Sequence, residues 1–350
     1  MEKFDIDKIV RKNIEKLQPY SSARSEYRGD AEVFLDANEN SYGSPLDDNY
    51  HRYPDPLQWS LKLEISKIKG VPPQNIFIGN GSDEVIDIAF RIFCNPAEDN
   101  VIICPPTYGM YKVCANINDV EVREVLLTKD FQLNVEGILS ATDEHTKLLF
   151  ICSPNNPTGN DMNRMDIELL LNNFPGIVII DEAYINFSRQ KTFIQELVEY
   201  ENLLVMQTLS KAWGLAALRL GLGFASEKMI DLFNKVKPPY NVNLSSQQLG
   251  IKALANIKEV NAHIIDILEQ RNWIHAQLQQ FKFVQIIYAS DANFILVKVD
   301  DADKLYQYLL LHRIIVRNRS KEPLCYNCIR ITIGTPQENQ KLINTLKSYE

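Results

Sequence analysis

The fold is decided between Leu148 and Asp181, where two short apolar runs, LLFIC (Leu148–Cys152) and IVIID (Ile177–Asp181), flank a segment of helical length that begins near Asn163. Neither run alternates apolar with polar residues, which indicates strands that are buried on both faces. A strand, a helix and a second strand in this order are typical of a parallel crossover. The stretch therefore predicts a mostly parallel sheet with helices on both faces.

The same pattern extends in both directions along the chain. Three further apolar runs are expected to be strands: IFIG (Ile76–Gly79), VIIC (Val101–Cys104) and LLVMQ (Leu203–Gln207). Other segments of helical length begin near Ser82 and Thr107. Ligands of such sheets bind at the carboxyl ends of the strands. The residues that follow each run are therefore the first candidates for a functional site.

The chain changes in character on either side of this region. Residues 1–40 are expected to form an N-terminal arm, with an apolar helical stripe from Phe4 to Leu17 and a short strand near Val33–Leu35. Residues 41–280 are expected to form a large domain that ends in a long helical stretch over Ser245–Phe281. Residues 281–350 are expected to form a smaller α+β domain. Its strands are expected near Val284–Tyr288, Phe294–Val299, Ile314–Arg317 and Ile329–Ile333, and its helices near Asp303–Leu311 and Pro336–Ser348.

The composition is that of a globular protein and narrows the classes of partner. Of the 350 residues, 45% are hydrophobic and 23% are charged, which excludes a mainly disordered or fibrous chain. Lysine and arginine number 37 against 45 acidic residues, so the net charge of −8 argues against a nucleic acid or an anionic membrane as a partner. No run reaches the roughly 18 apolar residues of a membrane span, and the N-terminal segment is charged where a signal peptide would be apolar. We expect a cytoplasmic protein.

The six cysteines predict reduced thiols and not a disulfide framework, because they are scattered through apolar or strand-like surroundings of a long chain. Only Cys325 and Cys328 have the spacing of metal ligands or of a redox pair. Since no second such pair or histidine pair lies nearby in the sequence, we expect no metal site.

Polar motifs follow four of the apolar runs. The first is GNGSDE (Gly79–Glu84), between an expected strand and an expected helix. Its glycines permit a tight turn, and the N–H groups of Ser82 and Asp83 at the start of the helix could hold a phosphate. The third glycine of a dinucleotide fingerprint and the Gly-Lys-Ser/Thr of a nucleotide P-loop are both absent. Taken alone, the motif is equally explained by a capped turn.

The second and third motifs follow the two runs that decide the fold. SPNNPTG (Ser153–Gly159) comes directly after LLFIC, and its prolines make a rigid loop that directs two asparagine amides toward the sheet. Asp181 ends the IVIID run, where a buried carboxylate requires a cation or a hydrogen-bond donor opposite it. A cap of the next segment is the alternative for Asp181.

The fourth motif is Thr208-Leu209-Ser210-Lys211, which follows LLVMQ, with Arg219 eight residues beyond Lys211. A lysine at the end of a buried strand is partly desolvated, which lowers its pKa and makes its amine nucleophilic. A surface lysine whose stem lies on apolar neighbours is the alternative.

Together these motifs fit one ligand, pyridoxal 5′-phosphate (PLP). Its aldehyde would react with Lys211, and Asp181 would pair with its protonated ring nitrogen. Other residues would bind its phosphate (Ser82, Asp83, Ser210 and Arg219), bond its phenolic oxygen (Asn156 and Tyr184) and cover its ring (Tyr108).

The chain resembles the fold-type-I PLP-dependent aminotransferases over nearly its whole length, which implies an α/β fold with a large, mostly parallel sheet flanked by helices and a smaller α+β domain. The motifs that carry the resemblance are Pro19–Arg24, Leu35–Asn40, Arg52–Pro56, Gly79–Glu84, Pro105–Tyr111, Ser153–Gly159, Asp181–Tyr184, Thr208–Lys211 and Ile329–Gly334. Tyr20, the Arg52–Pro56 string, and the stretch Ile315–Arg319 with Arg330 thirteen residues beyond Arg317 resemble the branch of that family that uses histidinol phosphate. Trp213-Gly214 departs from many relatives and leaves the packing beside Lys211 in doubt.

The resemblance implies a role for each matching residue. Lys211, Asp181 and Tyr184 are the catalytic set. The cofactor-binding set is Ser82, Asp83, Tyr108, Asn156, Asp181, Tyr184, Thr208, Ser210, Lys211, Arg219 and Tyr53, and in this family Tyr53 reaches the cofactor of the neighbouring subunit. The substrate-binding set is Tyr20, Asn38, Arg317 and Arg330. For Arg319 we expect a surface ion pair.

The implied reaction is a transamination in histidine biosynthesis, from histidinol phosphate to 2-oxoglutarate, which gives imidazole acetol phosphate and glutamate. The implied assembly is a homodimer with composite active sites. An aromatic amino-acid aminotransferase and a phospho-amino-acid decarboxylase are alternatives on the same cofactor set. A PLP-binding regulator would need a DNA-binding module, for which the short, non-basic segment before the first family motif leaves no room.

Overall fold

A seven-stranded sheet forms the centre of the protein in a computed structural model that describes residues 4–20, 32–46 and 50–349. In spatial order its strands are β1 (Ile76–Asn80), β7 (Leu220–Phe224), β6 (Leu203–Thr208), β5 (Ile177–Asp181), β4 (Thr146–Cys152), β2 (Asn100–Ile103) and β3 (Glu121–Glu124). β7 runs antiparallel to both of its neighbours, and the other neighbouring pairs are parallel. The mostly parallel sheet expected from the sequence is confirmed.

The apolar runs form strands because both faces of the sheet are buried. In β5, Val178 and Ile180 belong to one hydrophobic cluster, whereas Ile177 and Ile179 belong to the cluster on the other face. The first cluster includes residues of α3 (Trp59–Lys69), α6 (Val135–Ser140) and α7 (Arg164–Asn173). The second includes residues of α4 (Ser82–Phe93), α5 (Met110–Ile117) and α8 (Glu227–Val236). Helices therefore cover both faces, as the absence of alternation in the runs predicts.

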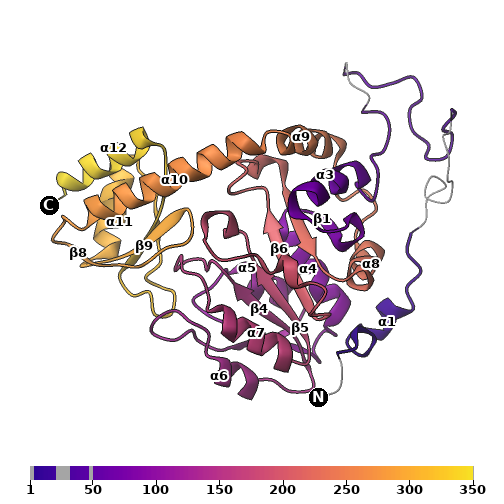
Figure 1. Ribbon diagram of the computed structural model, residues 1–350, viewed down its shortest axis with the longest axis horizontal. Helices are drawn as coiled ribbons and strands as arrows, with labels where there is room; N and C mark the ends of the chain where they lie inside the picture. The colour runs from indigo at the N-terminus through magenta and orange to yellow at the C-terminus, as the bar shows by residue number, and fades with distance from the viewer. Residues whose placement is uncertain (1–3, 21–31, 47–49, 350) are drawn as a thin grey trace.

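A second, smaller sheet is antiparallel throughout. Its strands in spatial order are β10 (Arg317–Asn318), β11 (Cys328–Thr332), β9 (Phe294–Val299) and β8 (Val284–Ile287). The helices α10 (Ile257–Leu278), α11 (Ala302–Leu311) and α12 (Pro336–Lys347) share a hydrophobic cluster with it. α9 (Leu244–Leu254) precedes α10, which runs in orange along the top of Figure 1 toward the small sheet. The long helix α10 therefore connects the large sheet's helical layer to the small sheet.

The remaining helical turns are short. Among the described residues they are α1 (Lys12–Glu15) and five 3-10 turns, at Ile6–Lys8, Pro73–Asn75, Ile185–Phe187, Phe193–Glu196 and Ala216–Leu218. The helical stripe expected near the N-terminus is thus divided into two short pieces, although Ile6, Val10 and Ile14 are buried against the large sheet as the stripe predicts. Among the residues described, no helix combines the length and the apolar character that crossing a membrane requires.

Three expectations for secondary structure are wrong. Val33–Leu35 is not a strand: all three side chains are exposed, and the Phe34 carbonyl accepts from Arg52 Nη1 at 3.2 Å. The long helical stretch is divided between α9 and α10 at Ala255 and Asn256. The Asn256 side chain donates to the Lys252 carbonyl, and asparagine commonly competes with the helix backbone in this way. The predicted strand at Ile314–Arg317 is reduced to Arg317–Asn318.

Candidate active site

The carboxyl ends of the central strands lie side by side. Asp181 at the end of β5 is in register with Cys152 of β4 on one side and with Met206 of β6 on the other. The polar segments that follow these strands meet β10 and β11 around a cavity of about 220 Å³. It is lined by Ser82, Asp83, Tyr108, Cys152, Asn156, Asp181, Ala183, Tyr184, Thr208, Ser210, Lys211, Arg219, Arg317, Arg319 and Arg330. We call this cavity the central pocket.

Asp181 is a buried carboxylate with two donors. The Tyr111 hydroxyl donates to its Oδ2 at 2.7 Å, and the Ala183 N–H donates to its Oδ1 at 3.0 Å. Burial raises its pKa, and these hydrogen bonds oppose the shift. A cation that entered the central pocket next to Asp181 would keep it ionised. The position therefore suits a residue that pairs with a positively charged ring nitrogen.

Lys211 enters the central pocket directly after the β6 end. Its Nζ lies 5.6 Å from the centre of the Tyr184 ring. The side chain is open to the pocket, yet the surrounding protein lowers its pKa by desolvation, and the nearby charge of Arg330 lowers the pKa further. A lowered pKa leaves more of the amine neutral, which is the form that attacks a carbonyl.

A glycine-lined cradle lies between β7 and the start of α4. A Cβ atom at Gly221 would stand 2.1 Å from the Gly81 carbonyl carbon and 2.2 Å from the Ser82 nitrogen, so only glycine permits this approach. Gly81 has φ +81°, and its N–H donates to the Arg219 carbonyl at 2.7 Å. No side chain caps the N-terminus of α4. The backbone N–H groups in the first turn of α4 are thus a candidate anion site, and Arg219 lies beside it.

Asp83 is held by two neighbours in this cradle. The Tyr108 hydroxyl donates to its Oδ1 at 3.0 Å, and Arg219 Nη2 lies 3.4 Å from its Oδ2. Next to it, the Thr208 hydroxyl accepts from the Ser210 N–H at 3.1 Å. The four residues expected to bind a phosphate, Ser82, Asp83, Ser210 and Arg219, therefore lie together in the central pocket with Thr208.

The two asparagines of SPNNPTG have different environments. Asn155 is fully buried, and its amide nitrogen donates to the Pro106 carbonyl at 2.9 Å and to the Thr158 hydroxyl at 2.7 Å, which stabilises the loop. Asn156 lines the central pocket, and its Oδ1 accepts from Arg330 Nη1. This bond leaves the amide nitrogen of Asn156 available as a donor inside the pocket.

The small sheet contributes three arginines to the central pocket. Arg330 also lies over the Phe294 ring, 5.1 Å from its centre, and burial lowers its pKa to about 10 with the charge of Arg319 as the next cause. Arg319 forms the expected ion pair, with Nη1 3.5 Å from Glu322 Oε1. The expectation that this is its whole environment is wrong, because Arg319 also lines the pocket beside Arg317.

Three predicted site residues lie outside the central pocket. Tyr53 and Asn38 line a separate surface hollow, where the Tyr53 ring stacks on Tyr240 with ring centres 4.5 Å apart. Tyr53 is 51% exposed and Tyr20 is 71% exposed. Within one chain these residues are not brought together with Lys211.

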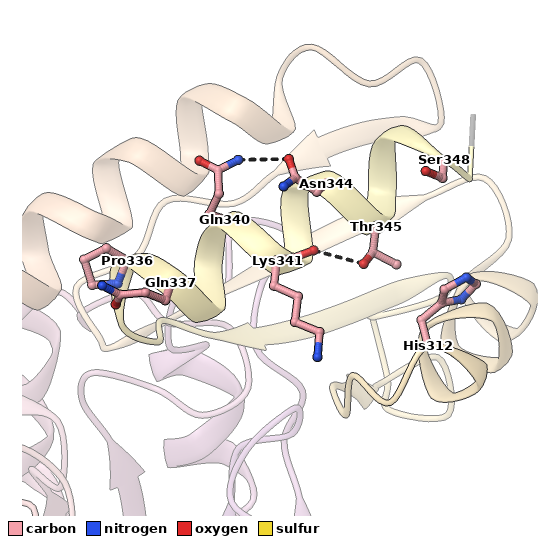
Figure 2. A pocket seen from close by; sticks show the side chains of 8 residues that line it. All are labelled: His312, Pro336, Gln337, Gln340, Lys341, Asn344, Thr345 and Ser348. Atoms are coloured by element: carbon pink, nitrogen blue, oxygen red, sulfur yellow. Dashed lines mark hydrogen bonds between the residues drawn. The ribbon is translucent and has the colours of Figure 1, made fainter.

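A larger, open hollow of about 630 Å³ lies along α12, opposite His312 at the end of α11 (Figure 2). Of the described residues that line it, none carries a carboxylate or a thiol. Two of its side chains bond within the helix, Gln340 to Asn344 at 3.0 Å and Thr345 to the Lys341 carbonyl at 2.9 Å. The central pocket, which holds both cationic and acidic side chains, is therefore the stronger candidate for an active site.

The charges of the central pocket fit an anionic ligand. Its lining holds five cationic side chains (Lys211, Arg219, Arg317, Arg319 and Arg330) and two carboxylates (Asp83 and Asp181). The side-chain Nε atoms of Arg319 and Arg330 are buried and have no hydrogen-bond partner within the described chain. Buried donors are normally satisfied, so the lining has the donors and the charge for a ligand with a phosphate, an aldehyde and a basic ring nitrogen.

Sequence reasoning missed Cys152, Ala183 and Arg319 as pocket residues, and it missed Tyr111 as the buried hydrogen-bond partner of Asp181. Tyr111 lies three residues after Tyr108 in the same motif, and that position is the signal that could have found it. Arg319 lies two residues after Arg317, the spacing of one face of a strand.

Comparisons with known proteins give the family of the chain. Residues 24–346 match the family Aminotransferase class I and II. The chain is 51% identical over 346 residues to the histidinol-phosphate aminotransferase of Cytophaga hutchinsonii and 53% identical over 346 residues to that of Bacteroides thetaiotaomicron, and each match covers 99% of both chains. The crystal structure of histidinol-phosphate aminotransferase from Sinorhizobium meliloti in complex with pyridoxal-5′-phosphate has the same fold, with a TM-score of 0.78, 22% identity and 90% of each chain covered.

The resemblance inferred from the motifs is thereby confirmed. A family match over most of the chain, together with relatives of about 50% identity over the full length, identifies the chain as a PLP-dependent transaminase. The chain belongs to the class I and II aminotransferase family.

Proposed function

We propose that this chain transfers the amino group of histidinol phosphate to 2-oxoglutarate, with PLP as its cofactor. The observation that carries the proposal is that Lys211 and the buried Asp181 share the central pocket with Arg317 and Arg330. A nucleophilic amine, a carboxylate for a ring nitrogen and guanidinium groups for an oxyanion are the parts that such a reaction requires. The names of the full-length relatives favour histidinol phosphate as the substrate.

Each part of the cofactor has residues in the central pocket that would hold it. Lys211 would bond its aldehyde, and Asp181 would pair with its ring nitrogen. The ring hydroxyl would accept from the amide nitrogen of Asn156 and from Tyr184, and Tyr108 would lie against the ring. The phosphate would be bound at Ser82, Asp83, Thr208, Ser210 and Arg219. When bound, PLP supplies a protonated ring that accepts electrons from the substrate carbon that bears the amine.

Asp181 maintains the charge on which this chemistry depends. Tyr111 and the Ala183 N–H orient its carboxylate and favour its ionised form, which burial alone disfavours. Because Asp181 is buried, the attraction between its carboxylate and a ring N–H would be stronger than in solution.

Lys211 moves protons at the substrate. Desolvation and the charge of Arg330 lower the pKa of its amine, which increases the neutral fraction. The neutral amine would accept the proton of the substrate carbon that bears the amino group and would return it to the cofactor carbon that carried the aldehyde. The Tyr184 ring lies beside the amine and restricts its position.

The substrate's anionic group would bind to Arg317 and Arg330, whose planar guanidinium groups suit a phosphate as well as a carboxylate. This dual use explains how one site could accept both histidinol phosphate and glutamate. We further propose that Tyr20, Asn38 and Tyr53 complete the site of the partner subunit in a homodimer, because they are exposed or line a separate hollow. The proposed enzyme acts in the cytoplasm.

An absorbance scan of the purified protein tests the proposal. A visible band that shifts when glutamate is added, and that returns with 2-oxoglutarate, is expected of a transaminase. Histidinol phosphate should then be converted with a higher kcat/KM than phenylalanine. Release of CO₂ from a phospho-amino acid without a shift by glutamate would favour the decarboxylase, and a preference for phenylalanine would favour the aromatic aminotransferase.

A further inference from the structure

We propose that Arg319 is a specificity-determining residue that, with Arg317 and Arg330, binds the phosphate of the amino substrate and favours it over a carboxylate. The inference rests on the proposed function and extends it to a residue that was expected from the sequence to form only a surface ion pair.

The backbone places the three arginines on one face of the small sheet. Arg317 and Arg330 are opposite each other in the antiparallel pair β10 and β11. The Arg319 N–H donates to the Cys328 carbonyl at 2.8 Å, which continues the pairing by one step. Residues two apart on a strand, and residues directly opposite, share a face. The side chain of Arg319 therefore follows those of Arg317 and Arg330 into the central pocket.

Two guanidinium groups of this face keep a donor that has no partner among the described residues, although Arg330 bonds Asn156 and Arg319 bonds Glu322. The Nε atoms of Arg319 and Arg330 are buried and unpartnered among the described residues. Among the described residues, no carboxylate oxygen lies within 4.0 Å of a guanidinium nitrogen of Arg317 or Arg330. Arg317, Arg319 and Arg330 line the same pocket, and burial, followed by the charge of Arg319, lowers the pKa of Arg330.

Glu322 compensates only part of this charge. Its Oε1 is 3.5 Å from Arg319 Nη1, and the Glu322 side chain is 37% exposed. Ion pairs that are this exposed contribute little. Arg319 can therefore exchange Glu322 for a ligand, or bind the ligand with the atoms that Glu322 leaves unused.

The number of arginines matches a phosphate better than a carboxylate. A phosphate monoester carries a charge of about −1.5 to −2 near neutral pH and presents three terminal oxygens. A carboxylate carries one charge and two oxygens, which two guanidinium groups already satisfy. The third arginine thus adds more to the binding of a phosphorylated substrate than to the binding of glutamate.

The test measures the reaction of the PLP-loaded enzyme with histidinol phosphate and its reaction with glutamate separately, in Arg319→Gln and in Arg319→Lys. Single-turnover absorbance changes of the PLP-loaded enzyme give kcat/KM for histidinol phosphate and for glutamate separately. We expect Arg319→Gln to lower the value for histidinol phosphate by roughly 10- to 100-fold, the range for loss of charge-assisted hydrogen bonds, and to lower the value for glutamate at least tenfold less. Arg319→Lys should recover part of the loss. Arg313→Gln, at an exposed arginine ahead of β10, is the matched control.

A binding measurement removes turnover from the test. The dissociation constant of inorganic phosphate, measured by calorimetry on the PLP-loaded enzyme, should rise at least tenfold in Arg319→Gln. In Glu322→Gln it should fall, since the competing carboxylate is gone, and this fall should vanish in the double variant Arg319→Gln/Glu322→Gln.

The outcomes separate the inference from the proposed function. If the wild-type enzyme shows no amino transfer from glutamate, the proposed function fails. If the wild type transaminates but Arg319→Gln binds phosphate and histidinol phosphate as the wild type does, or loses glutamate and histidinol phosphate equally, the assignment of Arg319 is overturned.

Discussion

Arg330 Nη1 donates a hydrogen bond to Oδ1 of Asn156, and this bond joins β11 of the small sheet to the loop after β4 of the large sheet. The residues are 174 positions apart in the sequence. The bond orients the amide of Asn156, and it also keeps the Arg330 charge near enough to Lys211 to lower the pKa of the lysine. One arginine therefore positions a donor and tunes a nucleophile in the same pocket.

Arg330→Gln should raise the pKa of Lys211, because it removes the largest charge effect that lowers that pKa. The neutral lysine is the reacting form, so the rate of PLP uptake by the cofactor-free protein should reach its midpoint at a higher pH than in the wild type. Stopped-flow absorbance across a pH series measures this midpoint. Arg313→Gln should leave it in place. An unchanged or lower midpoint in Arg330→Gln would show that Arg330 does not tune the lysine.

Asp181→Asn should lower kcat by at least about 100-fold, or roughly 2.7 kcal/mol of transition-state stabilisation, because an amide cannot hold a ring nitrogen protonated. The amide oxygen of the variant can still accept from Tyr111, so the fold should survive with modest loss of cofactor. Rates at saturating PLP, alongside the thermal midpoint, separate chemistry from stability. An effect below tenfold would mean that Asp181 is a structural cap.

Gly221→Ala should weaken PLP binding and lower the thermal midpoint. The new Cβ would meet backbone atoms of Gly81 and Ser82 at 2.1 and 2.2 Å, and forced overpacking typically costs about 1–3 kcal/mol. Gly223→Ala is the matched control on the same strand, since its nearest neighbour is a Val85 side-chain carbon at 3.3 Å. Thermal unfolding and PLP titration of both variants provide the comparison. If the two variants have the same PLP affinity and the same thermal midpoint, the close approach of Gly221 to Gly81 does not shape the anion site.

Gly221 and Gly223 also explain why β7 was not predicted from the sequence. The runs of β4, β5 and β6 are apolar without interruption, so their strands and the residues at their ends could be predicted. β7 reads LGLGF, and its glycines hide a strand whose close approach to Gly81 only the folded chain reveals. Glycine weakens a strand signal and often marks such an approach.

The environments of individual side chains were the other feature that could not be predicted from the sequence. The sequence analysis chose Asn156 for the cofactor, and Asn156 lines the pocket, but the sequence could not show that Asn155 stabilises the loop from a fully buried position. It also could not show that Arg319 reaches the pocket, because an i, i+3 partner such as Glu322 is a sufficient local explanation for an arginine. The boundaries at residues 40 and 280 stay predictions.

The last prediction concerns the subunit to which Tyr53 contributes. The residue stands in the Pro-rich Arg52–Pro56 string, is 51% exposed, and lines a hollow separate from the central pocket of its own chain. If its hydroxyl binds the cofactor phosphate of the partner subunit, Tyr53→Phe removes a charge-assisted hydrogen bond worth about 1.5–3 kcal/mol. The variant should bind PLP roughly 10- to 100-fold more weakly. Tyr42→Phe, at an exposed tyrosine near the arm, is the control.

Mixing two defective variants then decides whether the site is composite. A Tyr53→Phe chain keeps Lys211, and a Lys211→Ala chain keeps Tyr53 but cannot turn over. In a two-fold symmetric dimer, a mixed pair has one site with both defects and one site with neither. With random pairing, roughly half of the dimers are mixed, so activity at limiting PLP should exceed the average of the two parents. If the mixture shows no more than that average, Tyr53 does not act across the interface, because a residue that served its own chain would leave both sites of every mixed dimer defective.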